Sequence, residues 1–492
     1  MKANSRWSTR SAQLFALALC VACDALAQPQ LDLTARPAWN GWSRSGRSTE
    51  IFVRVRSAER VHVRVSAKAG AQAVTSDLDL EPGRAVALHM PIASADRITV
   101  TGELRETPLI NHELRIAQSV APLLAVAMAS GQAIELEDLH TLSVGPESLP
   151  RNGSAFSSID ALIIDGGALR ALDSSQLDAL IAHTAACGRT VLVNVEPAAR
   201  EVFENAAGCS GRLLMTATSP AQAASVLKAS LADTSAAQVE STAARDLARI
   251  DLASWYRALV LLAASFAIVL VALSFSSFTI MFVIVPLLAT AALWVCLNAM
   301  EAVSVVAVWA EAESGARIAR YDARQQVRSL SRKPTEIPAL ARLGSMQACD
   351  PNQPMRFNFD AARGLTTSVE FEGRLFRSAA LCYAGTLPLA RSIAIDTISD
   401  SAVDVRNAGR LAWPSGVLIA RRDAYPLPAL GPRDRATIST HANHSAPGPA
   451  VRTALARMPT DGLAALWEFD PAAVADSAGR VTAWLFVPIP RR

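Results

Sequence analysis

The chain lacks the short motifs by which many nucleotide-dependent enzymes and serine hydrolases are recognised. It has no glycine-rich phosphate loop of the P-loop or dinucleotide-binding type, and no Gly-x-Ser-x-Gly nucleophile elbow. His441 and His444 stand three apart, but no Cys, Asp or Glu lies in the same loop to complete a zinc site, so we expect no metal. The formal net charge of +3 over 492 residues argues against a dedicated nucleic-acid binder. These absences leave no motif that calls for a cofactor.

Charge is missing from one long stretch. Ala258 to Met300 runs for 43 residues without Asp, Glu, Lys or Arg. A single helix of this length would be about twice as long as the ~30 Å hydrocarbon core of a bilayer. The run therefore predicts two transmembrane helices over 256–300, with the hairpin tip at Ser274–Thr279; the alternative is a buried hairpin in a large soluble protein. Because the run has no carboxylate, histidine or basic side chain for ions or protons, we interpret it as an anchor and not as a transport path.

The N-terminus has the pattern of an export signal. A basic start precedes an apolar run from Leu14 to Ala22, and Ala25–Ala27 offers the small-x-small pattern that signal peptidases cleave. Residues 1–27 are therefore predicted to be a signal peptide. A lipoprotein signal acylated at Cys20 or Cys23 is the alternative.

Cysteine is scarce, and its placement is informative. The chain has seven cysteines, of which Cys296 lies in the uncharged run and four others fall as one pair on each side of it. Export into an oxidising compartment would permit the disulfides Cys187–Cys209 and Cys349–Cys382. The alternative is four buried free thiols.

Residues 28–115 have the alternation of a β domain. Apolar and polar residues alternate in runs such as Ile51–Arg56, and short strands at close spacing predict an antiparallel sandwich of immunoglobulin-like type. Trp39 and Trp42, with two arginines nearby, could form a ligand platform. An edge or packing feature is the alternative for this motif.

Residues 116–250 change to alternating strands and helices. Ala161–Ile164 is a short apolar run typical of a buried parallel strand. Asp173 and Gln176 form a capping-box pattern at the start of a helix. Asp165 follows the apolar run at the carboxyl end of the strand, where α/β sheets bind ligands, although polar residues there also close turns. The sequence predicts an α/β domain with Asp165 as a candidate ligand residue.

Three stretches of this domain, Ile159–Asp165, Leu172–Leu180 and Gly188–Val193, resemble the class I glutamine-amidotransferase-like fold of membrane-anchored bacterial envelope proteins. Enzymes of this class place a cysteine nucleophile in a tight Gly-x-Cys-x-Gly turn, whereas Cys187 lies in Ala-Ala-Cys-Gly at the end of a helix. The resemblance therefore implies a degenerate domain without a catalytic residue.

His183 lies four residues before Cys187, at a helical spacing that makes a Cys–His dyad conceivable. The alternative is an exposed or half-packed histidine beside a structural cysteine. A disulfide between Cys187 and Cys209 would abolish the dyad.

Residues 301–345 are predicted to be a charged connector. It begins with an apolar piece, Ala302–Ala310, and continues with arginines at regular intervals. These are Arg317, Arg320, Arg324, Arg328 and Arg332. On a helix most of them would form a basic stripe that meets anionic head groups or an acidic partner; a solvated connector and a strand through 318–327 are the alternatives. Residues 346–492 return to alternating runs between Pro and Gly turns, which predict a second β-rich domain.

The sequence thus predicts a multidomain α+β membrane protein: an N-terminal β-sandwich, an α/β amidotransferase-like domain, a two-helix transmembrane hairpin and a C-terminal β-rich domain. We expect a non-catalytic scaffold or binding protein of the bacterial cell envelope, anchored in the inner membrane with its N- and C-terminal domains in the periplasm. The expected partners are the lipid bilayer and other envelope proteins.

Two alternatives stay open at this point. One is an enzyme that modifies an envelope glycan or peptide at the α/β sheet edge, around Asp165 and His183. The other is a sugar-binding subunit of a polysaccharide export system that uses Trp39 and Trp42.

Overall fold

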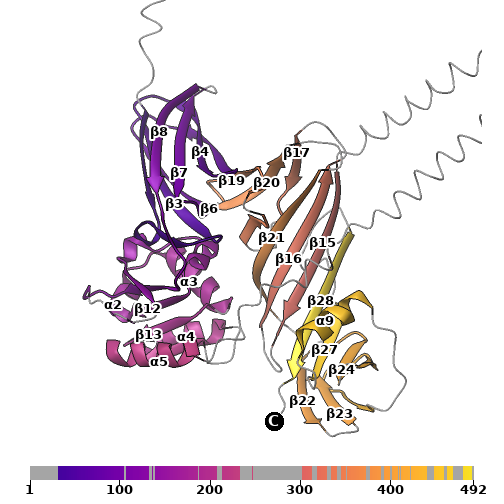
Figure 1. Ribbon diagram of the computed structural model, residues 1–492. Coiled ribbons are helices and arrows are strands. Elements are labelled where there is room, and N and C mark those ends of the chain that lie inside the picture. The colour runs from indigo at the N-terminus through magenta and orange to yellow at the C-terminus, as the bar shows by residue number, and fades with distance from the viewer. Residues whose placement is uncertain are drawn as a thin grey trace, which may run out of the picture.

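The computed structural model describes residues 31–232 and 302–489, apart from short gaps, and residue 247. The gaps are 105–106, 132–133, 135, 137–138, 187, 208–212, 313–317, 330–333, 341–344, 351, 373–376, 389–392, 399–401, 408, 411, 421–422, 440–447, 459–462 and 469–479. Figure 1 shows three layered parts: the N-terminal strands in indigo, an α/β layer in magenta, and a C-terminal group of strands from orange to yellow.

The N-terminal strands form two sheets that share one core. A three-stranded antiparallel sheet has the order β1-β3-β6, and β5, β4, β7 and β8 run in sequence within a larger sheet. The alternation of apolar and polar residues accounts for these strands. In β3, for example, Ile51, Val53 and Val55 are fully buried while Arg54 and Arg56 are exposed. The strands are β1 (Leu31–Pro37), β2 (Trp42–Arg44), β3 (Ser48–Ser57), β4 (Val61–Ala69), β5 (Gln72–Leu80), β6 (Ala85–Ala93), β7 (Arg97–Leu104), β8 (Thr107–Arg115) and β9 (Ala117–Ser119), with a 3-10 turn, η1 (Trp39–Gly41).

The α/β layer contains a five-stranded parallel sheet in the order β11-β10-β12-β13-β14. The capping box at the start of α3 is present, since the Asp173 carboxylate accepts from the Gln176 N–H and the Gln176 side chain accepts from the Asp173 N–H. Its elements are β10 (Leu123–Ala127), β11 (His140–Ser143), η2 (Pro146–Ser148), η3 (Gly153–Ser158), β12 (Ala161–Asp165), α2 (Gly166–Arg170), α3 (Ser174–Ala185), β13 (Thr190–Val193), α4 (Pro197–Ala206), β14 (Leu214–Ala217) and α5 (Pro220–Ala232).

The C-terminal part is built around an eight-stranded sheet in the order β18-β21-β16-β15-β28-β27-β24-β25. One face of it joins the core of the N-terminal strands, and α9 covers part of the other face, near Trp309 and Leu466. The elements are β15 (Ala302–Glu311), β16 (Ile318–Ser329), β17 (Thr335–Pro338), β18 (Ser345–Ala348), β19 (Met355–Asp360), β20 (Leu365–Phe371), β21 (Ser378–Pro388), β22 (Ile393–Ile398), β23 (Ala402–Asn407), β24 (Gly416–Ala420), β25 (Asp423–Leu427), β26 (Arg435–Ser439), α9 (Pro449–Arg457), β27 (Leu463–Glu468) and β28 (Arg480–Ile489).

The N- and C-terminal strands meet in a single sheet. Strand β19 pairs in parallel with β5, with Met355 opposite Gln72 and Asn358 opposite Thr75. The resulting seven-stranded sheet has the order β17-β20-β19-β5-β4-β7-β8, and Figure 1 shows β19 and β20 between the two groups of strands. One buried hydrophobic cluster extends from Leu31 to Val487. The sequence suggested separate β domains at the two ends, but their strands share both a sheet and a core.

The predicted fold class is wrong. Strands contain 56% of the described residues and helices 19%, so this part of the chain is mostly β and not the α+β fold that the sequence predicted. The predicted signal peptide and the predicted hairpin over 256–300 lie outside the described residues. Among the residues that the structure does describe, no helix is long and apolar enough to cross a membrane. On this finding we withdraw the two-helix anchor and the inner-membrane localisation that depended on it.

The predicted connector over 301–345 is also corrected. Strands β15 and β16 occupy neighbouring central positions in the eight-stranded sheet, and their antiparallel register joins Ala302 to Ser329 and Glu311 to Arg320. The arginines at 320, 324 and 328 do share one face, but it is the face of a strand. A spacing of four residues fits one face of a helix and equally one face of a strand, so the spacing alone could not separate the two.

Candidate functional site

The two tryptophans predicted as a ligand platform pack the N-terminal strands against the α/β layer. Trp39 is fully buried, and its indole N–H donates to the Ala155 carbonyl oxygen at 3.0 Å. Its ring meets Phe156 edge-on at 5.2 Å between centroids. The ring of Trp42 lies 4.1 Å from that of His140. The structure therefore uses this motif for packing.

The arginines that follow those tryptophans bind a buried carboxylate. Arg44 Nε and Arg47 Nη2 lie 3.2 and 3.3 Å from the oxygens of Asp160, whose side chain is 6% exposed. Asp160 also accepts from the Leu123 N–H at 2.8 Å. Burial lowers the pKa of Arg189, and the charge of Asp160 opposes that shift. These side chains join the N-terminal strands to the amino-terminal edge of the parallel sheet.

Asp165 has a structural role at the opposite edge of the parallel sheet. Its carboxylate accepts from the Ala129 N–H at 3.1 Å and from the Ala168 N–H at 2.7 Å, which caps α2. Gly167 packs closely beside it, because a Cβ on this residue would lie 2.6 Å from the Ala129 Cβ. At the edge where such sheets bind ligands, the Asp165 carboxylate thus bonds the protein's own backbone.

His183 is buried among apolar groups. Its ring stacks on Phe156 with 4.9 Å between centroids, and its Nε2 has no hydrogen-bond partner among the described residues. Burial lowers the pKa of His183 to about 4. A Cβ on Gly188 would lie 2.1 Å from the His183 ring, so only glycine allows this close approach. The predicted partner Cys187 lies outside the described residues, and so does Cys209.

Asp165 and His183 are not brought together. Asp165 ends β12 at the carboxyl edge of the parallel sheet, and α3 then leads the chain back to the start of β13. His183 near the end of α3 therefore lies towards the amino-terminal edge. The two predicted residues cannot act on one substrate from opposite edges of the sheet.

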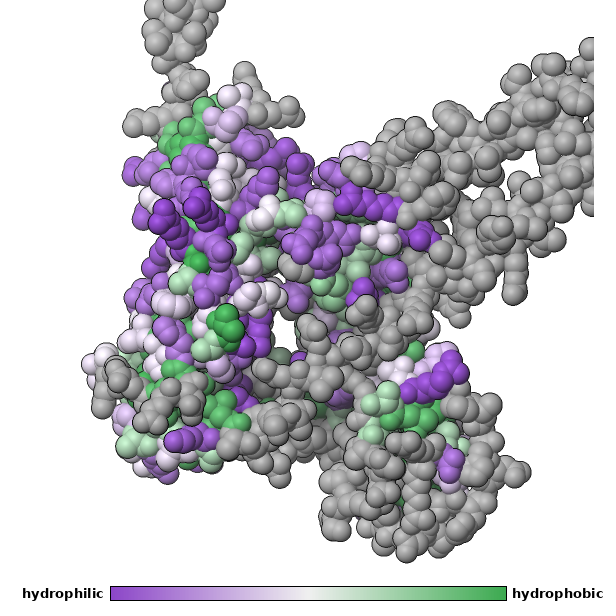
Figure 2. All heavy atoms as spheres, in the orientation of Figure 1, coloured by the Kyte–Doolittle hydropathy of each residue, from purple (hydrophilic) through white to green (hydrophobic). Residues whose placement is uncertain are grey.

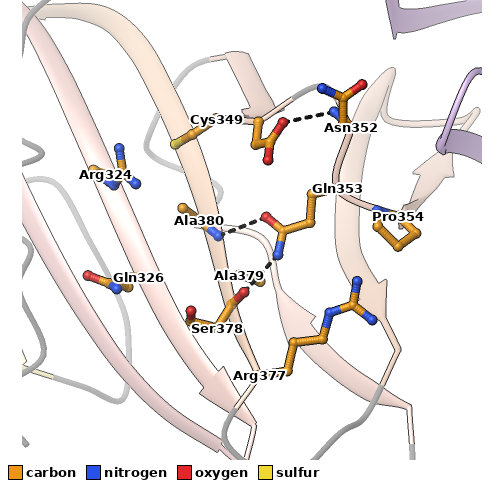
Figure 3. A pocket seen from close by; sticks show the side chains of 11 residues that line it. Arg324, Gln326, Cys349, Asn352, Gln353, Pro354, Arg377, Ser378, Ala379 and Ala380 are labelled. Atoms are coloured by element: carbon orange, nitrogen blue, oxygen red, sulfur yellow. Dashed lines mark hydrogen bonds between the residues drawn. The ribbon is translucent and has the colours of Figure 1, made fainter.

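The structure contains a polar pocket elsewhere, on the outer face of the eight-stranded sheet (Figure 3). Its volume is about 530 Å³. The lining residues come from β16, from the loop between β18 and β19, and from the start of β21. They are Arg324, Gln326, Cys349, Asp350, Asn352, Gln353, Pro354, Arg377, Ser378, Ala379 and Ala380.

Strand alternation produces the floor and one wall of this pocket. Ala323, Gln325 and Val327 are buried in the core, so Arg324 and Gln326 stand on the outer face of β16. Small residues face them across the ladder, since Arg324 pairs with Cys382, Gln326 with Ala380 and Arg328 with Ser378. The long side chains of β16 beside the short ones of β21 leave a depression in the sheet surface.

The opposite wall is a loop that the disulfide Cys349–Cys382 attaches to β21. Gln353 in this loop bonds the backbone of β21 as a strand would: its amide nitrogen donates to the Ser378 carbonyl oxygen at 2.8 Å, and its amide oxygen accepts from the Ala380 N–H at 3.4 Å. Asp350 accepts from the Asn352 N–H at 2.9 Å. The loop is therefore fixed by a covalent bond and by several hydrogen bonds.

Charges of both signs line the pocket. Arg324 and Arg377 lie on either side of Ser378 and Ala380 in Figure 3, and Asp350 supplies a carboxylate. Arg377 donates to Glu372 at 2.8 Å. Within the described residues, no three His, Cys, Asp or Glu side chains are grouped to hold a metal ion. The pocket can bind a hydrogen-bonding ligand, but it presents no pairing of nucleophile and base among its lining residues.

The sequence did not predict this pocket. Arg324 was expected in a basic stripe and Cys349–Cys382 as a possible disulfide, whereas Gln326, Gln353 and Arg377 were not singled out. Two features of the sequence could have led to the site. One is the series of polar residues at alternate positions on β16, and the other is the cysteine pair Cys349–Cys382, which attaches the loop to the neighbouring strand β21.

Comparisons with known proteins assign no family to the chain. No family model matches it, and no curated protein matches it. Among solved structures, it is similar to the yeast delta-COP-I mu-homology domain complexed with a Dsl1 WxWxV peptide, at 9% identity and a TM-score of 0.19, over 39% of this chain and 96% of that one. The same yeast domain without the peptide gives 8% identity and a TM-score of 0.17, with the same coverage. At these TM-scores the likeness carries no argument about fold, ligand or partner.

Proposed function

We propose that this protein is a non-catalytic binding protein, and that its ligand is a small polar molecule held in the pocket between β16, β21 and the loop at 349–354. The pocket carries this proposal. Its volume of about 530 Å³ lies within the range of small-molecule sites, ~300–1,000 Å³. Its polar lining suits a ligand that replaces water by hydrogen bonds on several sides.

The roles of the chemistry-bearing residues support binding over catalysis. Asp165 caps a helix, His183 is enclosed by apolar groups, and Asp160 is held by arginines. A general acid or base needs reach to a reacting group, and the first two residues lie at opposite edges of one sheet. On this proposal the α/β layer is a degenerate amidotransferase-like domain that serves as a structural layer.

The surface supports a polar ligand as well. Figure 2 shows that hydrophilic residues predominate over the N-terminal strands on the face in view. Among the described residues, the exposed large hydrophobic residues are Val120 just after β9, Val202 on α4 and Leu365 at the start of β20, which are far apart in the sequence. Such scattered apolar residues are ordinary on a protein surface and do not indicate an apolar docking patch.

The test is a steric block of the pocket. Ala380 lies on its floor, so Ala380→Phe should abolish saturable binding of any hit from a library of polar small molecules, measured by thermal shift and titration calorimetry. The matched control is Ala384→Phe, on the same face of β21 but outside the pocket lining, and binding should survive there. A library without a single saturable hit would contradict the proposal.

Catalysis is tested separately. The purified protein should show no turnover in hydrolase and amidotransferase assays. Turnover that Asp165→Asn abolishes would overturn the non-catalytic assignment.

A further inference from the structure

We propose that the outer face of the three-stranded sheet β1-β3-β6 binds an acidic, extended peptide segment of a partner protein, and that Arg54 and Arg56 bind its carboxylates. This face is built from other strands than the polar pocket, so the proposal does not depend on the proposed function.

Strand alternation places a row of β3 side chains on this face. Phe52, Arg54 and Arg56 alternate with three fully buried apolar residues, and both arginines are exposed. The row runs along the middle of the sheet, because β3 is its central strand. The residues opposite Arg54 are short, namely Thr34 on β1 and Ala87 on β6. Neighbouring side chains therefore leave the two guanidinium groups accessible from outside.

Arg54 and Arg56 are not paired with acidic side chains. Within the described part of the chain, neither side chain has an ion pair or a hydrogen bond. On the outer face of the seven-stranded sheet, several basic side chains do have acidic partners, namely His62 with Asp79, Arg64 with Asp77 and Arg97 with Glu113. The β3 row thus presents two adjacent positive charges whose mutual repulsion an anionic partner would relieve.

The spacing of the two arginines matches an extended peptide. Residues two apart in a strand lie about 7 Å from each other, and alternate side chains of any extended chain have the same separation. A segment with Asp or Glu at alternate positions can therefore present one carboxylate to Arg54 and the next to Arg56. Guanidinium groups match carboxylates in geometry as well as in charge, and clusters of arginines recognise acidic motifs in this way.

The end of the row at Phe52 favours a peptide over a nucleic acid. The Arg36 guanidinium lies over the Phe52 ring, 4.7 Å from its centroid, and the His89 ring meets it edge-on at 4.7 Å. Single-stranded nucleic acids bind proteins by stacking bases on aromatic rings, and here Arg36 already covers one face of the ring. The small net charge of +3 points in the same direction.

Asp32 opposes the binding of an acidic segment. It is exposed on β1, opposite Arg56 in the register of the sheet. Its carboxylate repels acidic residues of a bound peptide, so removal of this charge should strengthen binding. A merely structural role of the two arginines would not produce this effect.

The experiment uses the full chain and a labelled heptapeptide of alternating threonine and glutamate, with blocked ends. Fluorescence anisotropy should show saturable binding at low salt, and the affinity should fall as salt screens the charges. A heptapeptide with glutamine in place of each glutamate should bind at least about tenfold more weakly, because it has no charge to pair with the arginines. A heptapeptide with its glutamates adjacent should bind about threefold more weakly, because neighbouring side chains of an extended chain point to opposite sides.

Arg54→Gln and Arg56→Gln should each weaken binding of the alternating peptide about three- to fivefold, which is the size of an exposed ion pair. Asp32→Asn should strengthen it about twofold. Arg64→Gln is the matched control, because the Arg64 side chain is 44% exposed on the other sheet and is paired with Asp77. Its affinity should equal that of the unmodified protein, and so should that of Ala380→Phe, which blocks the polar pocket. Circular dichroism checks that each variant is folded.

An equal loss in Arg64→Gln would overturn the proposal, because only the net charge of the protein would then matter. A lack of saturable peptide binding would overturn it as well. Equal affinity for an oligothymidylate of the same charge, or for vesicles that contain an anionic lipid, would overturn the peptide assignment. All of these outcomes would leave the proposed function of the polar pocket intact.

Discussion

Several residues that carry functional chemistry elsewhere have structural roles in this protein. His183 is the clearest example, because its ring is enclosed beside Phe156 and its Nε2 meets no hydrogen-bond partner in the part of the chain that the structure describes. Burial disfavours the charged imidazolium, which lowers the pKa of His183 to about 4 from 6.5. A buried histidine of this kind makes the unfolding free energy depend on pH, whether or not it binds a ligand.

His183 should make the protein less stable in acid. Above pH 6.5 its ring is neutral in both the folded and the unfolded state, so it adds no pH dependence there. As the pH falls from 6.5 towards 4, the unfolded state takes up the proton first, and folding stability falls by up to about 3 kcal/mol at about 1.36 kcal/mol per pH unit. His183→Phe and His183→Gln should both remove this component of the pH dependence of the unfolding free energy, measured by urea denaturation.

The matched control for this experiment is His62→Phe, since the His62 side chain is 64% exposed and pairs with Asp79 at the surface. This variant should keep the acid-dependent loss. A His183→Phe profile parallel to that of the unmodified protein would refute the role given to His183.

At the scale of secondary-structure elements, the loop at 349–354 depends on a covalent bond to β21. The disulfide Cys349–Cys382 spans a sequence separation of 33 residues. It joins strands that are already neighbours, since β18 and β21 pair over residues 345–348 and 381–384. Its contribution should therefore come mainly from restricting the unfolded chain.

The double variant Cys349→Ala with Cys382→Ala should lose about 3–4 kcal/mol of unfolding free energy, because a closed loop of this length removes that much chain entropy from the unfolded state. Denaturation with and without a reductant measures the effect. Reductant should destabilise the unmodified protein by a similar amount and leave the double variant unchanged. A reductant effect of equal size in both proteins would assign the stabilisation to a different cysteine pair.

At the scale of the whole molecule, the pairing of β19 with β5 joins parts of the chain that are more than two hundred residues apart in sequence. Phe357 on β19 is 5% exposed and belongs to the same core cluster as Val74 on β5. A shared sheet and a shared core should make the N- and C-terminal strands unfold together.

Phe357→Ala tests this coupling. We expect a loss of about 3–5 kcal/mol, the usual cost of removing a buried phenylalanine side chain. Tryptophan fluorescence and far-ultraviolet circular dichroism should move to lower denaturant together, in one transition. Two separated transitions, with only the later strands affected, would show that the two groups of strands fold independently.

Local patterns predicted some elements correctly. Alternation identified β3, and the capping box of Asp173 and Gln176 is present at the start of α3. These features depend on neighbours a few residues away, so the chain itself carries the information. The cysteine pair Cys349–Cys382 is bonded in the structure, as one of the two alternatives for these residues anticipated.

Other features could not be derived from local patterns. The apolar strand β15 was taken for part of a connector, because its burial depends on neighbours from β16 and from the distant β28. Trp39, Trp42 and Asp165 were predicted as candidate ligand residues, whereas the structure shows Trp39 and Trp42 in packing contacts and Asp165 as a helix cap. Whether such residues face solvent or the interior depends on what packs against them.

The sequence by itself determined local elements of this protein, such as the alternation of β3 and the start of α3. Only the tertiary structure decided that β19 completes the sheet of β5, that Asp165 and His183 lie at opposite edges, and that Arg324 and Arg377 line one pocket. The physical reason is that local patterns arise from backbone geometry within a few residues. Pairing of distant strands depends on a common core, to which segments from both ends of the chain contribute.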